Sequence, residues 1–230
     1  MPEKPIYLIA GGPGARRARG PDPLIQHVLR DLGVEKPRVA YIGAASGDNA
    51  AFLLLISRIL KRAGAGTVTL APLCGRRGSL ERALPVMEEA DVVFVSGGDV
   101  EAGMQVLREK RVLPNLARLR KAGKPFFGVS AGSIMLARQW VRWRNPDDDS
   151  TAEIFPCLGF APVLCDTHGE GEGWAELKAL LALCPAGSTG YGIVSGSAIA
   201  VQGRTVKALG GEVHVFRRGR GGVVQAETLS

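Results

Sequence analysis

One serine of the chain stands in a setting that suits a nucleophile. Ser130 is the centre of Gly128-Val129-Ser130-Ala131-Gly132, a G-x-S-x-G pattern. The apolar "PFFGV" ends at residue 129 and the helix-like "SAGSIMLARQ" begins at residue 130, so Ser130 falls on a predicted strand-to-helix turn. Such a turn exposes the hydroxyl at a helix N-terminus, where the N–H of Ala131 could stabilise an oxyanion. In a chain with 31 glycines the pattern alone is weak, and a structural turn explains it equally well.

A serine nucleophile needs a base, and the chain has three histidines. His27 lies in an amphipathic helical stretch and His214 in the alternating stretch "EVHVF", so packing or surface roles are expected for both. His168 follows a short apolar strand and opens the Gly-rich "HGEGEGW". His168 is therefore the best candidate for the base.

An acidic residue would orient the imidazole of such a base. "NPDDD" (145–149) lies between Ser130 and His168, which gives the order Ser, Asp, His found in α/β-hydrolases. Asp166 is closer to His168 in sequence, but side chains two apart on a strand share a face without necessarily meeting. For any single one of these aspartates, a solvated loop position is the simpler interpretation.

A second glycine turn lies in "VSGGDVEAGMQVL" (95–107). The N–H groups of Gly97 and Gly98 precede a predicted helix, which is a typical anion-binding position. Gly98 is the candidate for a second oxyanion donor. Asp99 is a candidate substrate-binding residue, although a plain helix N-cap explains it as well.

The elements that must position these residues alternate between strand and helix over the first two-thirds of the chain. This alternation predicts a doubly wound α/β fold, with a mostly parallel sheet and helices on both faces. The small residues of "AGGPG", "GAASGDN", "SGGD" and "GVSAG" end four of the strands and should share one sheet edge, where ligands bind. The predicted strands cover 5–12, 37–46, 66–73, 90–99 and 124–132, and the first three predicted helices cover 23–33, 49–64 and 79–90.

The 230 residues and 46% hydrophobic content suit one α/β domain spanning 1–230. After residue 185, short β-type stretches alternate with glycine pairs, which predicts an antiparallel C-terminal extension at the sheet's edge. No stretch of eighteen apolar residues occurs, and the first residues do not resemble a secretory signal. We therefore expect a cytoplasmic protein that does not bind membranes.

The net charge of +7 is spread along the chain, with small clusters at 15–20, 75–77 and 217–220. None of the clusters is interleaved with aromatic residues, so we expect solvated surface and no nucleic-acid partner. The four cysteines form no C-x-x-C pair, which favours reduced thiols over a zinc or redox site. No metal or organic cofactor is expected, and a homodimer is left open.

Four stretches in order, "IYLIAGG", "VFVSGGD", "FFGVSAGSIML" and "LCDTHG", resemble the serine peptidases that include dipeptidase E and cyanophycinase. The later stretches "GYGIVSGSAIAV" and "VKALGGEVHVF" are also similar to that family's ending. The resemblance spans nearly the whole chain. It implies a fold like that of class I glutamine amidotransferases, with serine in place of cysteine at the turn.

The resemblance also implies roles for single residues. Ser130 would be the nucleophile and His168 the base, with the N–H groups of Gly98 and Ala131 as oxyanion donors. The acidic residue falls in a window that begins at Asn145, and within it we favour Asp148. The alternatives are Asp147, Asp149 and Asp166.

Two stretches depart from the family. After the histidine the family usually has Phe and then arginines that help to hold acidic substrates, whereas this chain has Glu170 and Glu172. The family's Gly-Ile-Asp-Glu is replaced by Gly-Ile-Val-Ser at 192–195. As candidate substrate-binding residues, the two glutamates would repel an acidic side chain. We expect hydrolysis of small peptides or amides without strict Asp-Xaa preference. The alternative is a weak or inactive member that binds a small ligand or peptide.

Overall fold

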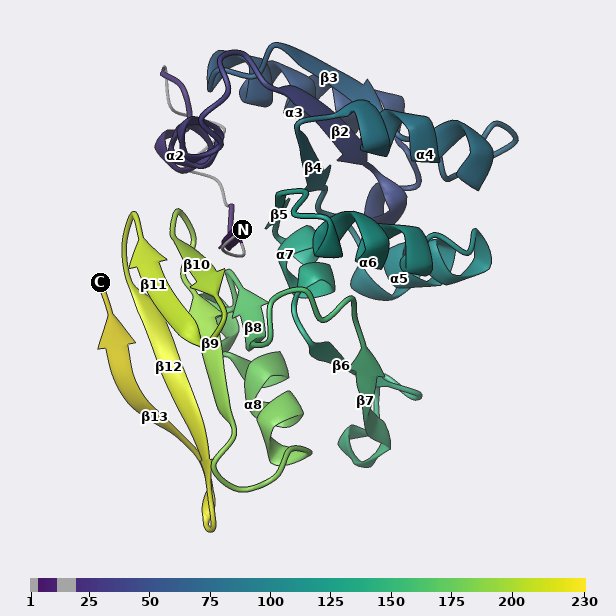
Figure 1. Cartoon of the computed structure of the whole chain (residues 1–230). Coiled ribbons are helices and arrows are strands. Elements are labelled where there is room, and N and C mark those ends of the chain that lie inside the picture. The colour runs from purple at the N-terminus through teal and green to yellow at the C-terminus, as the bar shows by residue number, and fades with distance from the viewer. Residues whose placement is uncertain (1–3, 12–19) are drawn as a thin grey trace.

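The fold is described from a computed structural model, which describes residues 4–11 and 20–230. Its main sheet has the strand order β11-β10-β1-β5-β4-β2-β3 (Figure 1). The five strands from β1 to β3 in that order are mutually parallel, whereas β10 runs antiparallel to β1, and β11 to β10. The strands are β1 (Ile6–Ile9), β2 (Arg38–Ile42), β3 (Thr67–Leu70), β4 (Val92–Val95), β5 (Phe126–Val129), β10 (Ala198–Gln202) and β11 (Thr205–Leu209).

Helices cover both faces of this sheet, as the β-α alternation predicts. On one face α2 (Pro23–Asp31) and α3 (Ala50–Arg62) pack on alternate strand residues such as Tyr41 and Phe94. The intervening strand residues pack against the helices of the other face, among them Ile42 and Val95. Those helices are α4 (Leu80–Glu89), α5 (Val100–Glu109), α6 (Leu113–Lys121) and α7 (Ala131–Leu136).

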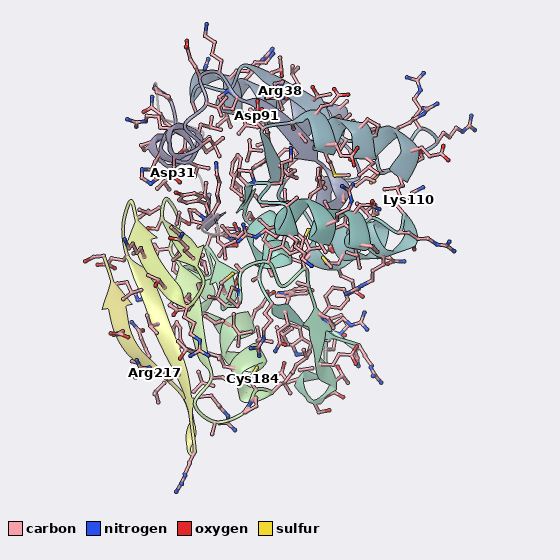
Figure 2. All side chains as sticks on the ribbon, in the orientation of Figure 1. Asp31, Arg38, Asp91, Lys110, Cys184 and Arg217 are labelled. Carbon is pink, nitrogen blue, oxygen red and sulfur yellow. The ribbon has the colours of Figure 1, made fainter. Side chains whose placement is uncertain are left out.

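The local sequence sets where these helices begin. A side-chain oxygen of Asp22, Asn49, Ser79 or Asp99 accepts a backbone N–H in the first turn of α2, α3, α4 or α5, respectively. At the amino end of the sheet, Arg38 and Asp91 form an ion pair between β2 and the residue before β4 (Figure 2). The glycine turns that follow β4 and β5 lie at the opposite, carboxyl ends of these strands.

The rest of the chain forms two smaller sheets. Four strands in the order β13-β12-β9-β8 pack against α8 (Ala175–Ala182), and a separate hairpin joins β6 to β7. The strands are β6 (Gln139–Trp143), β7 (Ala152–Pro156), β8 (Leu164–Thr167), β9 (Thr189–Ile193), β12 (Val213–Gly219) and β13 (Gly222–Leu229). Single 3-10 turns form η1 (Ala44–Ser46), η2 (Asp149–Thr151) and η3 (Glu170–Glu172).

The antiparallel C-terminal extension is thus confirmed, but it is divided between two sheets. Only β10 and β11 extend the main sheet, while β9, β12 and β13 join β8 in the second one. The predicted helix after Ser130 ends at Leu136, and Gln139 already belongs to β6. Most of "AGGPG" and of the basic cluster at 15–20 lies outside the described residues. Among the helices of the described parts, none has the length and apolarity needed to cross a membrane.

Candidate active site

Ser130 lies on a sharp turn between β5 and α7. Its backbone has φ 55° and ψ −127°, a conformation that a non-glycine residue rarely adopts. The carbonyl of Ile9 at the end of β1 accepts both the N–H of Ser130 (2.9 Å) and the hydroxyl of the buried Ser133 (2.8 Å). The strained turn is therefore fixed to the neighbouring strand, as a nucleophile-bearing turn requires.

The glycines around Ser130 are required by close packing. A Cβ on Gly128 would lie 2.5 Å from the backbone of Gly132, and a Cβ on Gly132 would lie 2.0 Å from the carbonyl oxygen of Val95. Only hydrogen fits at either position, so β5, α7 and the end of β4 can approach one another. The G-x-S-x-G pattern thus has a steric cause in this fold.

His168 is brought to Ser130 from the second sheet. The Ser130 Oγ and the His168 Nε2 are 2.7 Å apart, within hydrogen-bond distance. His168 follows β8, and its N–H donates to the carbonyl of Ile193 on the parallel strand β9 (2.9 Å). Its φ of 48° ends the extended conformation, so its side chain does not follow the alternation of β8.

The two candidate oxyanion donors flank Ser130. Gly97 packs against Ser130, because a Cβ on Gly97 would lie 3.3 Å from the Ser130 Cβ and 3.7 Å from its Oγ. The next residue, Gly98, has φ 143° and is held so tightly against Ala45 that a Cβ would lie 2.0 Å from the Ala45 carbonyl oxygen. In residues 4–11 and 20–230, the N–H groups of Gly98 and Ala131 have no acceptor. Both remain available to bind an anion.

Buried polar contacts support the Gly97–Gly98 turn. Tyr41 in β2 donates its hydroxyl to the Ser96 Oγ (2.8 Å), and the Ser96 hydroxyl donates to the carbonyl of Gly97 (3.3 Å). The carboxylate of Asp99 accepts the N–H of Ala102 (2.8 Å), so it caps α5. The structure thus accounts for Asp99 as an N-cap, and its predicted contact with substrate stays a prediction.

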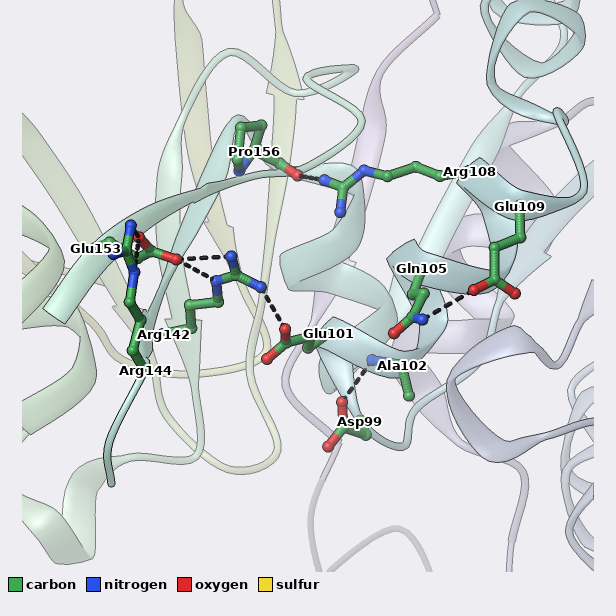
Figure 3. A network of polar contacts seen from close by, with 10 residues as sticks. All are labelled: Asp99, Glu101, Ala102, Gln105, Arg108, Glu109, Arg142, Arg144, Glu153 and Pro156. Atoms are coloured by element: carbon green, nitrogen blue, oxygen red, sulfur yellow. Dashed lines mark hydrogen bonds and ion pairs between the residues drawn. The ribbon is translucent and has the colours of Figure 1, made fainter. Parts of the chain in front are cut away.

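A charged network joins the start of α5 to the β6–β7 hairpin (Figure 3). The Arg142 guanidinium on β6 lies between Glu101 of α5 and Glu153 of β7, and Arg144 bonds the other oxygen of Glu153. Arg108, farther along α5, donates to the carbonyl of Pro156. The hairpin is therefore anchored to the helix that follows the Gly97–Gly98 turn, a connection that the sequence analysis missed.

Asp148, the favoured acidic partner of His168, is engaged elsewhere. It lies in the exposed connection between β6 and β7, where its carboxylate accepts the N–H (3.0 Å) and the hydroxyl (2.7 Å) of Ser150. These bonds lower the pKa of Asp148. No hydrogen bond joins Asp148 to His168. Nor does any bond join His168 to the alternatives Asp147 and Asp149, as far as the described chain shows.

Asp166 is a buried residue of β8. Its Oδ1 accepts the N–H of Thr167 (2.7 Å), and its Oδ2 lies beside Gly169, in the region covered by the Trp174 ring. Burial raises the pKa of Asp166 to about 7, and the charge of Glu176 adds to this shift. Asp166 has no hydrogen bond to His168 either, so in this region it is a buried acid rather than the partner of the imidazole.

The two glutamates after His168 differ in their contacts. The Glu170 Oε1 accepts the N–H of Ser195 at the end of β9 (3.1 Å). Burial raises the pKa of Glu170, but hydrogen bonds from Ser195 and the charge of His168 outweigh that effect, so the net shift is downward. The exposed carboxylate of Glu172 bonds no residue of the described ranges. Both glutamates are exposed, and their predicted contacts with substrate stay predictions.

The other two histidines pack against residues outside this site. His27 packs edge-on against Tyr7, and His214 on β12 contacts Gln225 and Trp174. All four cysteines are free thiols. Nowhere along the described chain do three or more potential metal ligands gather.

Comparison with known proteins places this arrangement in a family. The model of peptidase family S51 matches residues 7–209, which include both Ser130 and His168. The chain belongs to peptidase family S51. Among curated proteins, Peptidase E of Pasteurella multocida is 25% identical over 138 residues, a match that covers 56% of this chain and 58% of that protein.

Solved structures of low sequence identity share the S51 member's fold. A peptidase from an acI-B1 Actinobacterium superimposes with a TM-score of 0.71 at 17% identity, covering 99% of this chain and 96% of that one. A putative peptidase E protein from Listeria monocytogenes gives a TM-score of 0.65 at 16% identity, covering 90% of this chain and 98% of that one.

Among curated proteins, the pyridoxal 5'-phosphate synthase subunit PdxT of a Geobacillus species is also similar in sequence. It is 22% identical over 153 residues, which are 66% of this chain and 71% of that protein.

Proposed function

We propose that this S51 member is a serine-type peptidase that hydrolyses small peptide or amide bonds through an acyl-enzyme on Ser130. The observation that carries the proposal is the 2.7 Å distance between the Ser130 Oγ and the His168 Nε2. A hydroxyl held this close to an imidazole can lose its proton as it attacks. The family match supports the same chemistry.

In the first half of the proposed reaction, the Ser130 Oγ attacks the substrate carbonyl while its proton passes to the His168 Nε2. The carbonyl oxygen becomes an oxyanion, which the N–H groups of Gly98 and Ala131 stabilise. His168 then protonates the leaving amine as the C–N bond breaks, which leaves an ester on Ser130. In the second half, a water molecule gives a proton to His168 and attacks the ester, and His168 returns a proton to Ser130 as the acid product leaves.

Glu172 supports the expected substrate preference. Its exposed carboxylate lies four residues after His168 and makes no ion pair with the described residues. A negative charge there would disfavour acidic side chains, so we propose that neutral and basic peptides are the better substrates. Assay against a peptide library tests this preference, and selective cleavage after Asp would refute it.

The mechanism itself is tested by covalent labelling. A fluorophosphonate probe should label the wild-type protein at Ser130, and Ser130→Ala should abolish the label. His168→Ala should keep the fold and slow labelling roughly 10²-fold or more, the usual contribution of a general base. If the wild-type protein neither reacts with the probe nor hydrolyses any peptide, the proposal is wrong.

The second candidate function is binding of a small ligand or peptide without turnover. It is favoured by one observation: the His168 Nδ1 has no hydrogen-bond partner in the described parts of the chain. Stabilisation by peptides that are recovered uncleaved would support this candidate over the first. The cytoplasmic location, the lack of a nucleic-acid partner, the single domain and the homodimer remain predictions.

A further inference from the structure

We propose that Glu170 is the carboxylate that positions His168, and that it does not bind substrate. The inference rests on the proposed serine peptidase mechanism. The neutral imidazole of His168 can accept the Ser130 proton at Nε2 only when its own ring proton is on Nδ1. An acceptor beside Nδ1 is needed to hold that tautomer; Asp148 bonds Ser150 within the exposed β6–β7 connection, and Asp166 is buried in β8 against the N–H of Thr167.

Hydrogen bonds hold His168 and Glu170 to the same strand end. The His168 N–H donates to the carbonyl of Ile193, and the carboxylate of Glu170 accepts the N–H of Ser195, two residues farther along the same strand end. Both residues are thus attached to one short piece of β9 and its turn. The 3-10 turn η3 closes this loop, because the N–H of Trp174 donates to the carbonyl of Gly169 (2.9 Å).

The carboxylate of Glu170 has capacity for a second bond. Ser195 N–H uses Oε1, and a carboxylate offers about four acceptor positions on its two oxygens. A positive charge on His168 is among the causes that lower the pKa of Glu170. In the proposed arrangement the second oxygen accepts Nδ1–H while Oε1 stays on Ser195, and hydrogen bonds of this kind often tighten only when substrate is bound.

Glu172 provides a matched control for this role. It belongs to the same 3-10 turn, carries the same charge and is exposed like Glu170, but it bonds no residue of the described chain. Glu170→Gln and Glu172→Gln therefore remove the same charge two residues apart. Only the first places an amide N–H₂, a donor, where the imidazole needs an acceptor.

The decisive measurement is the tautomer of His168, read from its ring nitrogen chemical shifts in a two-dimensional ¹H–¹⁵N spectrum at a pH where the ring is neutral. We expect mainly the Nδ1–H form in the wild-type protein and in Glu172→Gln, and a change toward the Nε2–H form in Glu170→Gln. His27 and His214 act as internal references and should not change. Backbone spectra of both variants establish that each is folded.

The second measurement is the rate of fluorophosphonate labelling at Ser130. Glu170→Gln should slow it roughly 10²-fold, and Glu89→Gln, at the exposed C-terminal end of α4, should leave it within about twofold. An unchanged His168 tautomer in Glu170→Gln overturns the inference even if Ser130 is labelled. A changed tautomer in a protein that never reacts supports the positioning by Glu170 and refutes the peptidase instead.

Discussion

Replacing Asp166 by asparagine should make the protein more stable at pH 8 and leave its stability nearly unchanged at pH 4. The carboxyl is 7% exposed, and burial raises its pKa from the ordinary 3.8 to about 7, with further contributions from Glu176, Glu172 and Glu170. Asparagine keeps a carbonyl oxygen for the N–H of Thr167, and it carries no charge at any pH.

The direction of this stability change follows from how many protons Asp166 binds in the folded and in the unfolded protein. Between about pH 4 and pH 7 the folded protein holds a proton that the unfolded chain has released, so the free energy of unfolding falls as pH rises. At about 1.4 kcal/mol per pH unit, the interval from 3.8 to about 7 corresponds to roughly 4 kcal/mol as an upper value. The asparagine side chain does not titrate, so the stability of the variant relative to wild type should rise by up to that amount between pH 4 and pH 8.

Urea unfolding followed by tryptophan fluorescence, repeated from pH 4 to pH 8, measures this difference. Asp148→Asn is the matched control, because Ser150 lowers the pKa of Asp148 and its small contribution has the opposite sign. Wild-type and Asp166→Asn stabilities that run parallel over the whole range would refute the reasoning. Such a result would mean that water or a local rearrangement solvates Asp166 in the folded protein.

Three more predictions test the local geometry. Ser130→Gly should be more stable than Ser130→Ala by about 1 kcal/mol in urea unfolding, because glycine adopts the positive φ without strain. Gly132→Ala should lower the melting temperature severely, since its Cβ would lie 2.0 Å from the Val95 carbonyl oxygen, whereas Gly171→Ala has open space and should change little. Asp99→Ala should cost about 1 kcal/mol by loss of the α5 N-cap, with no change in the labelling of Ser130. Equal stability of the two Ser130 variants, or of the two alanine-for-glycine variants, would contradict the respective argument.

The alternation of strands and helices could be predicted because each element buries one set of side chains and is bounded by small or capping residues. The helix predicted at 79–90 is found at 80–89, and Ser79 is its cap. The strand predicted at 90–99 is found at 92–95, followed by the glycine turn. The turn at Ser130 could also be predicted, because the close packing of β5 and α7 requires the glycines at 128 and 132.

Other elements could not be predicted so directly. The stretch "QWVRWRNPDDDSTAEIFP" forms the β6–β7 hairpin, yet its strands pair only with each other and are held to α5 through Arg142. The helix α8 escaped prediction because its apolar residues serve the second sheet, which is absent from the simple α/β pattern. Sequence spacing also leaves the acidic partner of His168 open. Asp148 hydrogen-bonds within its own turn, and spacing alone does not show which carboxylate the fold brings to the imidazole.

The pairing of Ser130 with His168 depends on the junction between two sheets. Ser130 follows β5 of the main sheet, and His168 follows β8 of the second, so no single sheet sets the 2.7 Å distance. The turn 194–197 joins β9 of the second sheet to β10 of the main one.

Backbone hydrogen bonds tie this turn to both sides of the site. The carbonyl of Ser197 accepts the N–H of Ala10 (2.9 Å), directly after the Ile9 carbonyl that holds Ser130. At its other end the turn offers the N–H of Ser195 to Glu170, in the loop that carries His168. One short turn therefore sets the position of the candidate base relative to the candidate nucleophile. Because its bonds to the main sheet are made by the backbone, they do not depend on the side chains at 194 and 195.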